Sequence, residues 1–122
     1  MSESSPLHPN AIERLCKLGG AAFAGKMIDL FISYCGEKVA AARRAQVAGH
    51  WPGVAEAVHP IKSSAGNVGA TRVQDLATRL EQSAKQANAS QAVAELAELE
   101  QAFGEAKTAL ETQKAKLPLP PQ

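Results

Sequence analysis

One histidine of the chain lies among residues that suit phosphoryl chemistry. His59 is followed three positions later by Lys62, and Ser63 and Gly66 continue the spacing that places side chains on one face of a helix. An exposed imidazole nitrogen can act as a nucleophile, and a nearby ammonium can stabilise the oxygens of a phosphoryl group. Because the neighbours are small, we expect the ring to be uncovered. The pattern therefore predicts an open patch that handles a phosphoryl group, although a surface histidine without a chemical role is the ordinary alternative.

The segment around His59 has the apolar periodicity of a packed helix. Apolar residues recur at steps of four, three, four and three positions, at Val54, Val58, Ile61, Ala65 and Val68. His59 follows Val58 directly and so lies about 100° around the helix from that seam. We therefore expect the ring at the edge of the core, with its tip in solvent.

Residues 59–70 resemble the signature of histidine-containing phosphotransfer (Hpt) domains. They read His-Pro-Ile-Lys-Ser-Ser-Ala-Gly-Asn-Val-Gly-Ala, and the family pattern is usually written H-x-L-K-G-S-x-x-x-x-G-A. The likeness extends over about residues 10 to 113. It implies an all-α fold, an antiparallel up-down-up-down four-helix bundle. It also implies a role in a two-component multistep phosphorelay, in which His59 carries phosphate between the aspartates of receiver (response regulator) domains. A hybrid sensor histidine kinase would supply this phosphate.

The resemblance also implies a partner for the histidine. The family commonly has a Gln or Glu twenty-two positions later that orients the ring, and Glu81 occupies that position here. Glu81 lies one step off the seam through Leu80, as His59 lies one step off Val58, so the two could meet across a helix pair. A solvated carboxylate is an equally good interpretation. Lys62 is expected to stabilise the phosphoryl oxygens. The expected docking surface comprises Ala55, Glu56, Ser63, Gly66 and Lys85.

Two residues depart from the family pattern. Ser63 stands where glycine is typical, which adds a small hydroxymethyl group beside the ring. Pro60 removes the backbone hydrogen bond to the carbonyl of Glu56, and a proline inside a helix usually costs about 3 kcal/mol. Either the helix bends at Pro60 or a new helix begins there. The unbroken apolar seam favours the bend.

The chain is expected to form one domain over residues 10–114, between segments without fixed structure at 1–9 and 115–122. A short extra N-terminal helix over residues 10–18 should end at Gly19-Gly20 and lie over one end of the bundle. Four longer helices should follow: one over residues 21–48, one from Trp51 to near Gly69, one capped by Thr71 and one capped by Ser90.

Composition excludes several classes of function. With 122 residues and a net charge of +1, the chain lacks the basic field of nucleic-acid-binding and membrane-surface proteins. It has no apolar run of the ~20 residues that span a membrane and no signal peptide, so we expect a cytoplasmic monomer. Cys16 and Cys35 are expected to be reduced and buried. No zinc spacing is present, and the sequence predicts neither metal nor cofactor.

The sequence offers no means of making the phosphate. It lacks a glycine-rich nucleotide loop and an acidic cluster for Mg²⁺, so receiver domains would supply the aspartate and the metal. The chain would be a relay intermediate without kinase activity, and neither His8 nor His50 is an expected phosphorylation site. One alternative is a helical scaffold that binds receivers without phosphotransfer, which Pro60 keeps open. Another is an enzyme with His59 as general base, but the sequence provides neither a nucleophile nor an enclosed pocket for it.

Overall fold

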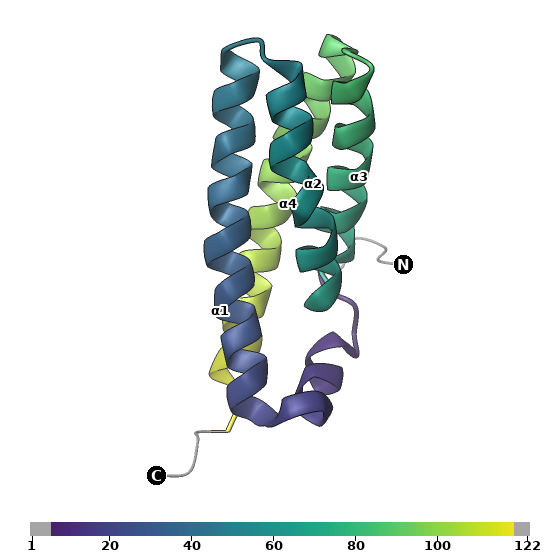
Figure 1. Cartoon of the computed structure of the whole chain (residues 1–122). Helices are drawn as coiled ribbons and strands as arrows, with labels where there is room; N and C mark the ends of the chain where they lie inside the picture. The colour runs from purple at the N-terminus through teal and green to yellow at the C-terminus, as the bar shows by residue number, and fades with distance from the viewer. Residues whose placement is uncertain (1–5, 119–122) are drawn as a thin grey trace.

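The computed structural model describes residues 6–118, which form an all-α four-helix bundle. The helices are α1 (Ala11–Val47), α2 (Trp51–Asn67), α3 (Thr71–Lys85) and α4 (Ala89–Ala115). Figure 1 shows that the chain runs up, down, up and down through them. α1 and α3 each pack against both α2 and α4, so α4 lies diagonally across the bundle from α2. The predicted four-helix bundle is confirmed.

The core is made of the apolar seam of each helix. In α1 the apolar seam consists of Ile28, Phe31, Cys35, Val39 and Ala42, which are all buried. Among the largest fully buried side chains of the other helices are Ile61, Leu76, Leu80, Leu96 and Leu99. Burying one such side chain contributes about 1.5–3 kcal/mol relative to leaving it exposed. These contacts fix the distance and rotation of α2 relative to α3.

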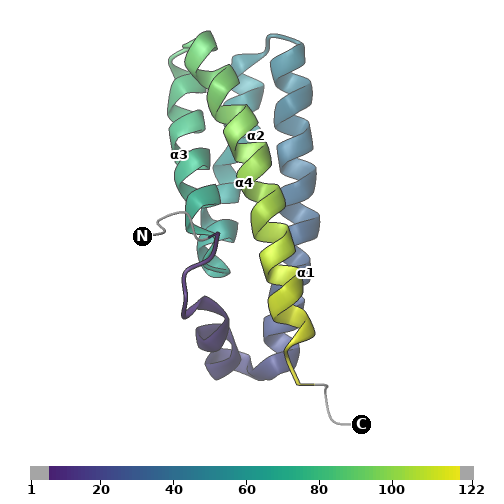
Figure 2. The ribbon, with the colours of Figure 1, turned by 180° about the vertical axis from the view of Figure 1, so that it is seen from behind.

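α1 contains a break at Gly20, where φ is 88°. Glycine adopts this conformation without the steric cost that a side chain would bring. The short helix expected over residues 10–18 is therefore the first part of α1 and not an additional helix. Helical turns continue on both sides of Gly20, so the two helices expected over residues 10–18 and 21–48 form the single helix α1. Figures 1 and 2 show this first part turning beneath the lower ends of α2 and α3.

The first part of α1 closes one end of the bundle. Leu15 is buried there, and Leu7 packs against the core. The backbone N–H of His8 donates to the carbonyl of Gly69, in the α2–α3 connection, at 2.7 Å. Leu7 and His8 belong to the segment 1–9 for which the sequence predicts no fixed structure. Residues 1–5, and residues 119–122 of the predicted tail, lie outside the described part of the chain.

α2 runs from Trp51 to Asn67 with Pro60 inside it. The alternative in which a new helix begins at Pro60 is therefore wrong. Val58 and Ile61, on either side of the proline, are fully buried. Packing of this seam maintains the helix although Pro60 cannot donate to the Glu56 carbonyl.

Two helix starts differ from expectation. The residue before α3 is Ala70, and Thr71 is the first helical residue and not the cap. α4 is capped by Asn88, whose side chain accepts from the backbone N–H of Gln91 at 3.4 Å, and not by Ser90. Asparagine and serine are comparable N-caps, so the sequence alone does not show whether Asn88 or Ser90 caps α4.

Both cysteines are free thiols. Cys35 is fully buried, and burial raises the pKa of its thiol to about 11, partly offset by a hydrogen bond with Ser64 of α2. Cys16 is only half-buried, which corrects the expectation that both are core residues. Among the described residues no helix combines the length and apolar character that crossing a membrane requires.

The substitution Gly69→Ala tests how the end of the bundle is closed. We expect it to lower the free energy of unfolding by at least about 2 kcal/mol, because φ at Gly69 is 74° and a Cβ there would collide with that of Ala11. Urea unfolding followed by circular dichroism measures the change. Gly104→Ala is the control, since Gly104 lies inside α4 with no atom near its Cβ position, and it should stabilise by about 1 kcal/mol. A Gly69→Ala protein as stable as wild type would contradict this account.

Candidate functional site

His59 lies on the exposed edge of α2, as its position beside the apolar seam predicts. Its side chain is 65% exposed, whereas Val58 and Ile61 are fully buried. The buried neighbours hold the backbone of His59 in place while the ring reaches solvent. A partner molecule can therefore approach the imidazole directly.

The carboxylate of Glu81, on α3, lies against the ring. Its Oε2 is 2.6 Å from Nδ1 of His59, and the Glu81 residue is only 6% exposed. The sequence left open whether Glu81 meets His59 or is solvated. The structure places it beneath the ring, in the contact between α2 and α3.

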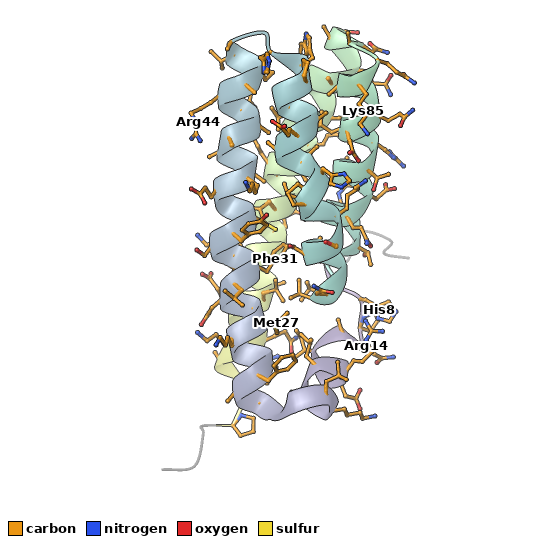
Figure 3. The ribbon with its side chains drawn as sticks, in the orientation of Figure 1. His8, Arg14, Met27, Phe31, Arg44 and Lys85 are labelled. Carbon is orange, nitrogen blue, oxygen red and sulfur yellow. The ribbon has the colours of Figure 1, made fainter. Side chains whose placement is uncertain are left out.

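Two lysines also converge on Glu81. Nζ of Lys62 pairs with Oε1, and Nζ of Lys85 lies 3.3 Å from Oε2. Lys62 was expected beside the histidine, but its ion pair with Glu81 was not predicted. The Glu81–Lys85 pair has the i,i+4 spacing of helical ion pairs, so this pair could have been predicted from the sequence. Figure 3 shows Lys85 on α3 and Phe31 on α1, on opposite sides of α2.

The charge of Glu81 determines what the ring can do. Burial alone raises the pKa of this carboxyl, but hydrogen bonds from Lys62, His59 and Lys85 outweigh it and lower the pKa to about 2. Near neutral pH Glu81 is therefore ionised and can only accept hydrogen bonds. Nδ1 of His59 must then carry the proton, which leaves the lone pair of the neutral ring on Nε2. The exposed imidazole thus has one free, nucleophilic nitrogen.

A second polar contact joins α2 and α3 one turn further along. Nε2 of Gln74 donates to the backbone carbonyl of Lys62 at 3.1 Å. A Cβ at Gly66 would lie 2.7 Å from that same nitrogen, so glycine makes room for the amide. Gly66, one of the expected docking-surface residues, is half-buried and lies against Gln74 of α3. Sequence reasoning missed Gln74, and the missing side chain at Gly66 was the only hint.

Three other residues expected at the site, Ala55, Glu56 and Lys85, line a hollow between α2 and α3. The hollow is lined by Pro52, Ala55, Glu56, His59, Glu81 and Lys85. Glu56 and Lys85 are exposed, whereas Ala55 is buried. Ser63 is exposed on α2 outside this hollow. Within residues 6–118 there is no group of three or more His, Cys, Asp or Glu side chains that could hold a metal ion.

Comparison with known families decides which kind of helical bundle this is. The family profile described as Hpt domain matches residues 26–114, a range that contains His59, Lys62 and Glu81. The chain belongs to the Hpt domain family. As an Hpt domain it is a phosphotransfer relay intermediate and not a kinase. No curated protein gives a match to the sequence.

The Hpt domain is also similar to a solved structure. This is histidine-containing phosphotransfer protein B (HptB) from Pseudomonas aeruginosa PAO1, with a TM-score of 0.85 and 18% sequence identity. The match covers 93% of this chain and 97% of the other. At this identity the likeness supports the fold alone. The structural likeness therefore covers more of this chain than residues 26–114, which the family profile matches.

The pH dependence of stability tests the state of Glu81. Because its pKa is lowered from 4.5 to about 2, its stabilising contribution is complete above about pH 4.5 and disappears as the pH falls toward 2. We expect Glu81→Gln to reduce the free energy of unfolding near pH 7 by up to about 3 kcal/mol. The difference from wild type should close as the pH is lowered through that range.

Urea unfolding of both proteins at a series of pH values measures this difference. The control is Glu111→Gln, an exposed position on α4, which should differ little from wild type at every pH. A Glu81→Gln difference that stays constant from neutral to acid pH would rule out the ionised, paired state.

Proposed function

We propose that this Hpt domain relays a phosphoryl group between receiver-domain aspartates through His59. The observation that carries the proposal is the 2.6 Å contact between Nδ1 of the exposed His59 ring and the buried Glu81 carboxylate. This contact orients the ring and directs the free lone pair of Nε2 to solvent. The partners would be receiver domains and a hybrid sensor histidine kinase, and the domain would act as a cytoplasmic monomer.

The proposed transfer forms one bond and breaks one bond. Nε2 of His59 attacks the phosphorus of an aspartyl phosphate in line, the N–P bond forms, and the P–O bond to the aspartate breaks, so that the carboxylate leaves. The ring becomes a cation that retains its Nδ1 proton, and the negative charge of Glu81 stabilises it. The reverse reaction passes the phosphoryl group to the aspartate of a second receiver. Each step depends chiefly on positioning and on charge.

The two lysines supply the positive charge for the phosphoryl oxygens. An ammonium has three N–H donors, so Lys62 can keep its pair with Glu81 and still donate to a phosphoryl oxygen. Its side chain is 30% exposed, which leaves it accessible beside the ring. Lys85 is 63% exposed and provides a second cation. The two lysines carry one more charge than the Glu81 carboxylate with which they pair, so they can still attract the phosphoryl oxygens.

The proposed docking surface spans α2 and the neighbouring part of α1. Leu30 and Tyr34 of α1 are exposed at 52% and 42% and lie one turn apart on the helix, and neighbouring exposed apolar side chains can mark an interaction site. They line a shallow hollow with Met27, Phe31, Ser64, Asn67 and Val68. This hollow and the one beside His59 flank α2 on its two sides. A receiver that straddles α2 would cover both.

The direct test is transfer of label from a phosphorylated receiver domain. A panel of receivers is phosphorylated with labelled acetyl phosphate, freed of donor and mixed with the Hpt domain. We expect label on the wild type and on His8→Gln, but none on His59→Gln, because the contact with Glu81 leaves a free lone pair on the exposed His59 ring. Unlabelled wild type that still binds receiver would instead indicate a scaffold. Label on His59→Gln would overturn the site.

The contribution of Lys62 is tested by Lys62→Ala. We expect the transfer rate at saturating receiver to fall at least about fivefold, because charge stabilisation of the transferring group is lost. Lys17→Ala is the matched control, since Lys17 is exposed and its ion pair within residues 6–118 is with Glu13, in the first part of α1, at 3.7 Å. Rapid-quench kinetics of the two variants give the comparison. An equal loss in both would show that Lys62 has no specific role.

A further inference from the structure

Glu56 differs from the other charged residues around the histidine in having no partner. Lys62 and Lys85 both pair with Glu81, which already accepts from three side chains. Glu56 is exposed one turn before His59 on α2, and within residues 6–118 no hydrogen bond or ion pair involves its carboxylate. It nevertheless borders the hollow that contains the His59 ring. A free carboxylate therefore lies at the place where a phosphoryl donor must approach.

The lining of this hollow matches one kind of side chain. Pro52 and Ala55 contribute apolar lining, and Lys85, which also lines the hollow, is paired with Glu81. The charge of the lining that has no partner within residues 6–118 is therefore the carboxylate of Glu56. Lysine and arginine combine a long apolar stem with a cationic end, and they bury the stem while the charge stays near solvent. Such a side chain could pack its stem against Pro52 and Ala55 and place its charge against Glu56.

We propose that Glu56 selects the receiver by pairing with a lysine or arginine of the receiver, whose stem lies in the hollow beside His59. This inference rests on the proposed function, because it assumes that a receiver docks over His59. It adds the chemistry by which that partner is recognised.

The same charge also affects how readily a phosphorylated receiver approaches His59. Residues three apart on a helix have Cβ atoms about 5–6 Å from each other, so an unpaired Glu56 carboxylate repels a phosphoryl anion arriving at His59. A receiver with a correctly placed cation removes this repulsion as it docks. A receiver with an acidic residue there adds a second repulsive pair. Glu56 thus favours one class of partner and disfavours the other.

Charge reversal at Glu56 tests the proposal. The variants are Glu56→Gln and Glu56→Lys, and the matched control is Glu98→Lys, an exposed, unpartnered glutamate of α4, the helix diagonal to α2. Phosphotransfer from a receiver that labels the wild type is measured at low and at high salt. We expect KM to rise about threefold for Glu56→Gln and at least about tenfold for Glu56→Lys at low salt, because an interfacial charge pair is lost or reversed. The rate at saturating receiver should stay within about twofold, and the KM effect should shrink at high salt.

Each other outcome has a defined meaning. If Glu56→Lys and Glu98→Lys change KM equally, or if the effect of Glu56→Lys does not depend on salt, the pairing is wrong. If His59→Gln carries label in the same assay, the proposed function has failed, whatever Glu56 does. Replacing the lysines and arginines of the receiver one at a time with glutamate gives a further test. One such variant should restore the wild-type KM to Glu56→Lys, and the absence of any rescue would contradict direct pairing.

Discussion

The buried carboxylate of Glu81 is the interaction on which the rest of the site depends. A charge removed from water is costly unless it is paired and hydrogen-bonded. Glu81 meets that requirement with three donors, from His59, Lys62 and Lys85. The same contacts that stabilise the carboxylate fix the proton of the ring on Nδ1 and hold two cations beside it. The single buried carboxylate therefore determines the orientation of the His59 ring, the position of its proton and the local electrostatic potential.

The fold contributes the position of that carboxylate. Val58 on α2 and Leu80 on α3 are fully buried, and the two site residues follow them directly in the sequence. Packing of the two seams brings His59 and Glu81 to the same edge of the helix pair. Small core residues allow the helices to approach closely, and the amide of Gln74 joins them one turn further on. Phosphoryl transfer depends on in-line geometry, so the placement of His59 by this helix pair matters for the transfer rate.

Apolar periodicity predicted the helices and the exposed edge on which His59 lies, because burying the apolar face of a helix determines which of its side chains face solvent. Periodicity does not determine which long side chains meet between helices, since that depends on helix rotation and on rotamers. The ion pair of Lys62 with Glu81 and the contact of Gln74 were missed for this reason. Pro60 shows the reverse case. Its local preference favours a break, but the buried residues around it keep α2 continuous.

The position of the proton on the neutral His59 ring tests the central claim most directly. Long-range ¹H–¹⁵N NMR of the ¹⁵N-labelled protein at mildly alkaline pH distinguishes the two tautomers, and phosphorylation with phosphoramidate then shows which nitrogen takes the phosphorus. The contact with Glu81 predicts a proton on Nδ1 and phosphorus on Nε2. A neutral ring with its proton on Nε2, or phosphorus bound to Nδ1, would contradict the account.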